Sequence, residues 1–167
     1  MTILRTGRVL GAVALSLSLL ASAAWADSPL DTSLKDLQGK PQKLSQWSGK
    51  PMVINFWAPW CGPCREETPD LVKLHKAYGN KVQFVGVAID EIAPVTQFTK
   101  QYQVTYPTLL GDGDALELMS KLGNVQGALP FTVVIDPQGK ITVKDLGRVK
   151  PDAMKKTLDG LLGSKKN

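Results

Sequence analysis

Apolar and polar residues follow one another along this chain in a pattern that predicts alternating strands and helices. Near-continuous apolar runs are typical of strands covered on both faces of a sheet, and they lie at 52–57, 82–89 and 131–135. Helices are expected at 63–78, 94–102, 115–122 and from Pro151 onward. The first two runs and the helix between them follow within about forty residues, so they form a βαβ unit with a parallel strand pair. The pattern therefore predicts an α/β fold.

Shorter elements extend this framework. Residues 31–44 are polar and strand-like around a central turn, and a short helical turn is expected directly after them. A short strand is expected at 105–110, and 141–146 is expected to form a hairpin with the strand before it. The chain shows no repeat, no low-complexity linker and no second domain. Residues 27–167 are therefore interpreted as one domain.

The first 26 residues have the composition of a targeting segment. Arg5 and Arg8 precede an apolar run at 9–20, and small residues follow up to Ala26. This order of basic, apolar and small residues is typical of a secretory signal peptide. A retained N-terminal anchor is the alternative interpretation. The apolar run is shorter than the ~20 residues of a membrane span, which favours the signal peptide. We expect cleavage after Ala26 and a location in the periplasm.

The charge of the chain argues against nucleic acid as a partner. Its formal net charge is +5, which falls to +3 once Arg5 and Arg8 are removed. The lysines are spread along the sequence, whereas a nucleic-acid footprint needs a clustered basic face. The lysines are therefore interpreted as a solvated surface.

The cysteine content points to chemistry at one place. The chain has two cysteines, Cys61 and Cys64, and both belong to a single CxxC. A bridge between them would close almost no loop, so it would constrain the unfolded chain very little. A zinc site would need further Cys or His ligands, and the chain offers only His75. We therefore expect a redox-active pair with no metal and no cofactor.

The two thiols lie where a strand gives way to a helix. The N-terminus of a helix carries free N–H groups and partial positive charge, which favour a thiolate over a thiol. Only the thiolate attacks a disulfide. Cys61 is expected to be the exposed nucleophile, and Cys64, one turn further into the helix, is expected to resolve the mixed disulfide.

A carboxylate shares the helix face of the second thiol. Steps of three and four residues place on one face Cys64, Glu67, Leu71, Leu74 and Tyr78. Most of that face is apolar, so Glu67 should be buried beside Cys64, while Glu66 falls on a polar face. Desolvation disfavours a charged carboxylate, which would suit Glu67 as the proton acceptor for the resolving thiol. The alternative is that Glu67 only stabilises the helix, as acidic residues of the first turn do through the helix dipole.

The stretch from Trp57 to Cys64 closely resembles the active-site signature of thioredoxins. The longer stretch from Val53 to Pro69 is more similar to the exported TlpA/ResA-type branch, and the similarity covers residues 28–163. This resemblance implies a thioredoxin fold, with a central mixed sheet flanked by helices, an N-terminal β extension and an inserted helix. It also implies thiol:disulfide oxidoreductase activity.

The resemblance assigns roles to further residues. Pro130 matches the cis-proline that sits against the disulfide, and Glu67 matches a buried glutamate of the family. Asn55 stands where cytoplasmic thioredoxins keep a buried aspartate. The cytochrome-maturation members carry an acidic residue after the cis-proline, where this chain has Phe131, so an apocytochrome c substrate is not assigned. The substrate groove implied by the resemblance is formed by Trp60, Gly62, Pro63, Leu129, Pro130 and Phe131.

Three functions are compatible with these residues. The leading hypothesis is a periplasmic enzyme that reduces disulfides of specific partner proteins through transient mixed disulfides at Cys61 and Cys64. By resemblance, a membrane thiol donor of the DsbD type would recharge it. The Gly62-Pro63 dipeptide resembles reducing thioredoxins, whereas the alternative of a dithiol oxidant would act in the opposite direction. A metallochaperone that holds Cu(I) between the two thiolates is the third hypothesis. A monomer is expected.

Overall fold

The computed structural model describes residues 28–111 and 113–163, so the predicted signal peptide at 1–26 lies outside the described residues. The strands are β1 (Ser33–Asp36), β2 (Pro41–Lys43), β3 (Met52–Trp57), β4 (Gln83–Ala88), β5 (Thr108–Leu110), β6 (Phe131–Ile135) and β7 (Ile141–Leu146). The helices are α1 (Gly62–Tyr78), α2 (Ile92–Gln101), α3 (Gly113–Lys121) and α4 (Pro151–Gly163), with 3-10 turns η1 (Pro29–Asp31) and η2 (Leu44–Trp47).

The strands form one seven-stranded mixed sheet in the order β2-β1-β5-β4-β3-β6-β7. Strands β3, β4 and β5 are parallel to one another, and β6 runs antiparallel to β3. The predicted hairpin is formed by β6 and β7, and the predicted N-terminal extension, β1 and β2, joins the sheet along β5. Because parallel strands end at the same edge of a sheet, the loops that follow β3, β4 and β5 meet at one end of the molecule.

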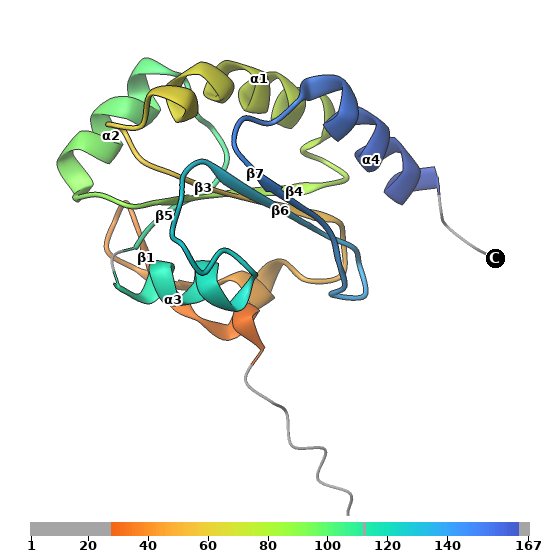
Figure 1. Cartoon of the computed structure of the whole chain (residues 1–167), viewed down its shortest axis with the longest axis horizontal. Helices are drawn as coiled ribbons and strands as arrows, with labels where there is room; N and C mark the ends of the chain where they lie inside the picture. The colour runs from red at the N-terminus through yellow and green to blue at the C-terminus, as the bar shows by residue number, and fades with distance from the viewer. Residues whose placement is uncertain (1–27, 112, 164–167) are drawn as a thin grey trace, which may run out of the picture.

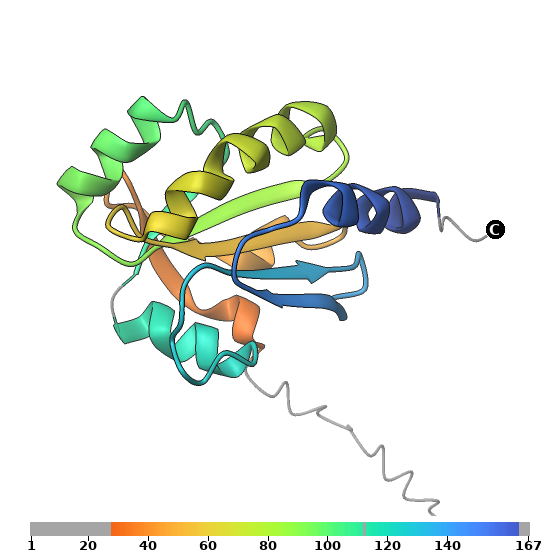
Figure 2. The same cartoon turned by 45° about the horizontal axis from the view of Figure 1, so that its top comes forward.

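Helices cover both faces of the sheet. Helices α1, α2 and α4 lie over one face, and α3 lies against the other with the N-terminal segment (Figure 1). Figure 2 shows α1 and α4 side by side over the strands, with α2 toward the opposite end. This arrangement is the mixed sheet with flanking helices, β extension and inserted helix that the resemblance implies.

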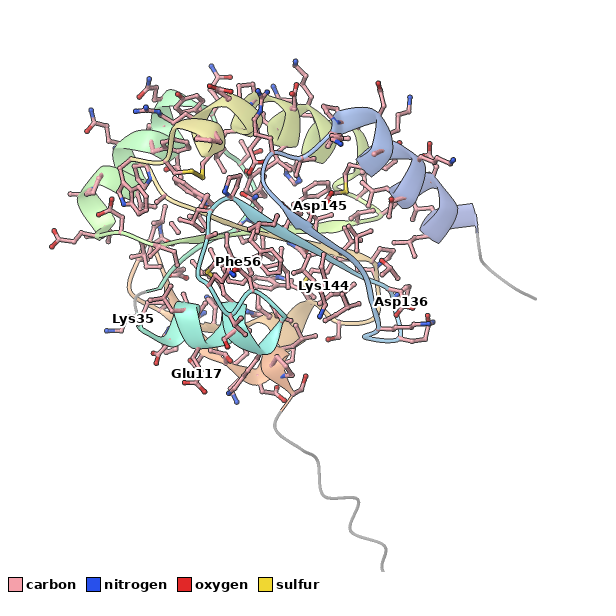
Figure 3. All side chains as sticks on the ribbon, viewed as in Figure 1. Lys35, Phe56, Glu117, Asp136, Lys144 and Asp145 are labelled. Carbon is pink, nitrogen blue, oxygen red and sulfur yellow. A yellow bond between two sulfur atoms is a disulfide. The ribbon has the colours of Figure 1, made fainter. Side chains whose placement is uncertain are left out.

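The buried strand β3 explains the apolar run at 52–57, since all six of its residues are buried. Ile54 and Phe56 point toward α3, where Phe56 lies between the sheet and that helix (Figure 3). Val53 points to the opposite face and packs in the core beneath α1 and α4. Alternate side chains of a strand point to opposite faces, so a strand covered twice needs apolar residues at almost every position. Asn55 is the polar exception in this strand.

Several predicted boundaries differ from the structure by one to three residues, and two of the differences have a clear physical cause. Strand β5 begins at Thr108 instead of residue 105. Pro107 has no N–H to donate, although its carbonyl oxygen still accepts from the N–H of Gly86 at 2.9 Å. Helix α2 begins at Ile92 instead of residue 94, because Glu91 keeps extended backbone angles and Pro94 falls within the first turn, where it needs no helical donor.

Candidate functional site

The two cysteines lie at the N-terminal end of α1. Cys61 is the N-cap residue, and its Sγ accepts a hydrogen bond from the N–H of Cys64 at 3.2 Å. The structure joins Cys61 and Cys64 in a disulfide with an S–S distance of 2.04 Å. When the bond is reduced, the same N–H and the partial positive charge of the helix end would stabilise a thiolate on Cys61.

The exposure of Cys61 corrects one expectation. Cys61 is 6% exposed and Cys64 is 0% exposed, so in the disulfide form the first cysteine is also largely buried. It belongs to a small apolar cluster that also contains Trp57, Ala58 and Phe98. Cys61 nevertheless remains the more accessible sulfur of the two, and an incoming thiolate would reach it first.

The predicted groove residues differ in their exposure. Trp60 is 65% exposed and Pro63 is exposed, whereas Gly62 and Leu129 are half-buried. The peptide bond between Leu129 and Pro130 is cis. The proline is buried, and its carbonyl oxygen accepts from the N–H of Gly147 at 2.8 Å.

Phe131 requires a correction. Its side chain is 3% exposed and packs in the core on the α3 face of the sheet, where its ring stacks on Phe56 at 5.8 Å. The phenyl ring therefore does not line a surface groove. The residue after the cis-proline points inward because it is the first residue of β6 and pairs with Phe56 of the central strand.

Glu67 is buried in the protein interior, as the helical pattern predicts, and is only 1% exposed. Its Oε1 accepts from Nδ2 of Asn55 at 2.8 Å, and its Oε2 accepts from the N–H of Val149 at 2.8 Å. Burial raises the pKa of Glu67 above its usual value, although the two hydrogen bonds and the nearby Arg148 act in the opposite direction. A carboxyl group with a raised pKa holds a proton more readily near neutral pH, which general acid–base chemistry requires.

The neighbouring Glu66 is exposed and forms an ion pair with Arg148, whose Nη1 lies 2.7 Å from Oε2 of Glu66. Arg148 follows β7 and precedes α4. The ion pair of Glu66 and the hydrogen bond from Val149 to Glu67 therefore attach the same connecting segment to α1 at two successive residues.

The Redoxin family matches residues 25–162 of the chain. The chain belongs to the Redoxin family. It is 34% identical over 136 residues to the thioredoxin-like protein YneN of Bacillus subtilis, covering 77% of this chain and 75% of the relative. It is 33% identical over 130 residues to the thiol-disulfide oxidoreductase ResA of Bacillus cereus, covering 76% and 70%.

Solved structures agree with this Redoxin assignment. A thioredoxin-related protein from Neisseria meningitidis serogroup B superimposes with a TM-score of 0.70 at 32% identity, covering 78% of this chain and 99% of that one. The dsbF protein of MTB superimposes with a TM-score of 0.71 at 29% identity, covering 80% and 97%. The chain is thus a ResA-like member of the thioredoxin-type oxidoreductases, with a thioredoxin fold and a CxxC pair.

His75 lies apart from the redox pair of this Redoxin-family protein. Its ring makes edge contacts with Phe84 and Tyr106, each at 5.5 Å between centroids. Its buried Nδ1 has no hydrogen-bond partner, and burial lowers its pKa. Within residues 28–111 and 113–163, no cluster of three His, Cys, Asp or Glu side chains could hold a metal ion. No helix in this part of the chain is long and apolar enough to cross a membrane.

Three partners could not be read from the sequence. Glu67 has the N–H of Val149 and the nearby guanidinium of Arg148, and Asn55 has the hydroxyl of Thr132. Asn55 donates to Oγ1 of Thr132 at 3.0 Å from the neighbouring strand β6. An amide inside an otherwise apolar strand was the available signal, because a buried polar group needs partners. The identity of those partners depends on strand register, which the sequence pattern does not provide.

Proposed function

We propose that the protein is an exported oxidoreductase that reduces disulfides of particular partner proteins with the dithiol form of Cys61 and Cys64. The observation that carries the proposal is the redox pair at the N-terminal end of α1, with Gly-Pro between its cysteines and a buried carboxylate one turn away. The Gly-Pro dipeptide supports the reducing direction through its resemblance to thioredoxins.

The proposed reaction transfers two electrons from the dithiol to the partner. The thiolate of Cys61 attacks one sulfur of the partner's disulfide, an S–S bond forms between the two proteins, and the partner's other sulfur leaves as a thiolate that takes up a proton. Cys64 then loses its proton to Glu67 and attacks Sγ of Cys61. The mixed disulfide breaks, the partner is released with two thiols, and the Cys61–Cys64 disulfide is formed.

Exposed apolar side chains support a protein as the substrate. In the described residues, the exposed large hydrophobic side chains are Trp60 (65%), Ile92 (47%), Leu116 (45%), Val125 (78%) and Leu146 (59%). Exposed apolar surface of this kind is typical of protein–protein contacts.

The topology brings Trp60, Ile92 and Leu146 to the disulfide end of the sheet. Trp60 and Ile92 follow the carboxyl ends of β3 and β4, and Leu116 lies in the first half of α3, which follows β5. Val125 belongs to the loop that leads to the cis-proline. Leu146 is the last residue of β7 and pairs with Phe131. Three surface hollows of about 840, 490 and 490 Å³ are lined by residues that include neither cysteine. We therefore favour an extended protein surface over a small molecule held in a pocket.

The proposed location rests on the targeting pattern of residues 1–26. An oxidising compartment outside the cytoplasm turns thiols into disulfides, so a reductase there needs a supply of electrons. We propose a membrane thiol donor of the DsbD type as that supply.

The proposal can be tested by trapping substrates as mixed disulfides with Cys61. A Cys64→Ser variant expressed with its targeting segment in the periplasm cannot resolve mixed disulfides, so Cys61 should remain joined to its substrates, which mass spectrometry would identify. The matched control carries both Cys61→Ser and Cys64→Ser and should trap nothing. If the single variant also captures nothing while both forms are exported and folded, the proposal of specific protein substrates is wrong.

A further inference from the structure

Three buried polar side chains connect the redox helix to the strand that follows the cis-proline. Glu67 of α1, Asn55 of β3 and Thr132 of β6 are 1%, 4% and 0% exposed. Nδ2 of Asn55 donates to both neighbours, to Oε1 of Glu67 at 2.8 Å and to Oγ1 of Thr132 at 3.0 Å. Asn55 and Thr132 are paired residues of adjacent strands, so the sheet fixes their separation.

These contacts favour one place for a proton on Glu67. Oε2 faces the N–H of Val149, which is a backbone donor and can only donate. A proton on Oε2 would make that oxygen a weaker acceptor for this N–H. The neutral carboxyl group keeps its stronger acceptor, the carbonyl oxygen, toward Val149 when it carries its proton on Oε1, the oxygen that faces Asn55.

A side-chain amide can satisfy both protonation states at that position. With Glu67 ionised, Asn55 presents its NH₂ group, which donates to the carboxylate and to Thr132. With Glu67 protonated, a half-turn of the amide presents Oδ1, which accepts from the carboxyl O–H and from the hydroxyl of Thr132. The hydroxyl can change from acceptor to donor because it has both capacities. An apolar residue could serve neither state, and a carboxylate could not donate.

We propose that Asn55 is a positioning residue whose reversible amide, supported by Thr132, lets Glu67 take up and return the proton of Cys64 while Asn55 keeps a hydrogen bond to both Glu67 and Thr132. This inference rests on the proposed role of Glu67 as proton acceptor. The proton passes from Sγ of Cys64 to Oε1 of Glu67, the Cys64 thiolate attacks Cys61, and the proton returns when Cys64 next leaves as a thiolate.

Charged and titratable groups around Glu67 come from two further segments. Arg148, between β7 and α4, favours the ionised carboxylate and is itself paired with the exposed Glu66. Tyr106, which precedes β5, is buried and stays neutral, since burial and the nearby Glu67 raise its pKa. Cys64 shares the helix face. Asn55 and Thr132 do not titrate, so their effect on pH dependence must act through Glu67.

The test uses the reduced full-length protein and DTNB as a small disulfide. The first equivalent of thionitrobenzoate released reports the attack by Cys61, and the second reports resolution by Cys64. Asn55→Asp should move the pH profile of the second phase upward by about one unit or more, because two adjacent carboxyl groups share a proton. The first phase should change by less than about threefold, since the variant leaves Cys61 in place.

A second pair of variants tests the same chain without adding a charge. Thr132→Val keeps the shape of the side chain and removes its hydroxyl, so the second phase should slow by roughly fivefold, the typical effect of one hydrogen bond. Thr132→Ser keeps the hydroxyl and should restore the wild-type rate. If Val and Ser at position 132 have equal second-phase rates and pH profiles, the proposed role of Thr132 is wrong.

The background of Glu67→Gln separates this inference from the function on which it rests. If Asn55→Asp shifts the profile of wild type but not that of the Glu67→Gln variant, Asn55 acts through Glu67, as proposed. An equal shift in both backgrounds would overturn the role of Asn55. If Glu67→Gln alone leaves the second-phase profile unchanged, the role of Glu67 fails first, whereas the trapping of partners by Cys61 would be unaffected.

Discussion

The carboxyl group of Glu67 is buried, yet both its oxygens accept hydrogen bonds from neighbouring groups. The cost of burial is the larger effect, and it raises the pKa above the usual value of 4.5. The folded protein therefore binds a proton on this group more tightly than the unfolded chain does. Between the two pKa values, the contribution of Glu67 to stability is lost as the pH rises.

A Glu67→Gln substitution should therefore become increasingly favourable to stability as the pH increases from about 4.5. Glutamine stays neutral at every pH, so it removes the cost of a buried charge. Denaturant unfolding of the oxidised protein at a series of pH values would measure the difference in free energy between variant and wild type. That difference should grow with pH and become constant above the folded-state pKa. A difference independent of pH would contradict the raised pKa.

His75 should make stability depend on pH with the opposite sign. Burial lowers its pKa below the usual 6.5, so the unfolded chain binds a proton that the folded protein resists. Stability is complete above about pH 6.5 and is lost as the pH falls toward the folded-state pKa. His75→Phe keeps a ring between Phe84 and Tyr106, and the chain has no other histidine. Unfolding midpoints should show the variant losing this dependence. If stability depends on pH equally in the variant and in wild type between about pH 5 and 7, the lowered pKa of His75 is wrong.

At the scale of single elements, one glycine of β4 leaves room for two aromatic rings beside that strand. A Cβ added to Gly86 would lie 2.9 Å from Nε1 of Trp57 and 3.3 Å from the ring of Tyr106. Both rings belong to buried residues, so neither can move into open solvent. The rings of Trp57 and Tyr106 thus pack in the space that a side chain at position 86 would fill.

Gly86→Ala should destabilise the protein by about 1–3 kcal/mol, the usual effect of overpacking a core. Gly160→Ala in α4 is the matched control, since a Cβ there meets no atom within 4 Å. That substitution should stabilise the helix by up to about 1 kcal/mol. Urea unfolding of both variants measures the two effects. Equal free energies of unfolding for the two variants would show that the space at Gly86 is not needed.

The elements were largely predictable because each depends on a local pattern. The run at 52–57 gave a strand with six buried residues, and the helix wheel placed Glu67 inside and Glu66 outside. Contacts that depend on register were not predictable. Thr132 and Val149 are 77 and 82 residues away from the side chains that they contact.

The burial of single side chains at the site depended on neighbours from other elements. The expected exposure of Cys61 was wrong: it is 6% exposed and belongs to an apolar cluster that includes Phe98 of α2. The side chain of Phe131 was expected in the groove, but as the first residue of β6 it faces the core and meets Phe56. A linear pattern does not show which residues of distant elements will cover a given side chain.

At the scale of the whole molecule, the two ends of the sheet differ in chemistry. The disulfide, Trp60, Ile92 and Leu146 lie at the end of the sheet where β3 and β4 finish, whereas the turn between β6 and β7 at the other end carries Asp136 (Figure 3). A partner protein that docked with its disulfide at Cys61 would therefore bury these exposed apolar side chains in the contact.

Ile92→Asp and Leu146→Asp should each slow the reduction of a protein disulfide, with insulin as the probe, by about tenfold in kcat/KM. Their reaction with DTNB should stay unchanged, because a small disulfide needs no docking surface. Gln138→Asp, an exposed change in the β6–β7 turn, is the control and should leave both reactions unaltered. Equal slowing with insulin and DTNB would indicate damage to the redox site instead of lost docking.

The reduction potential of the Cys61–Cys64 pair decides whether the protein reduces or oxidises its partners. The protein would be equilibrated with mixtures of oxidised and reduced dithiothreitol or glutathione, and the fraction in the disulfide form would be determined by thiol alkylation and mass spectrometry. A reductase of the thioredoxin kind should give a value near about −270 mV. A value near about −120 mV, as in the strong oxidant DsbA, would mean that the pair donates its disulfide and would contradict the account.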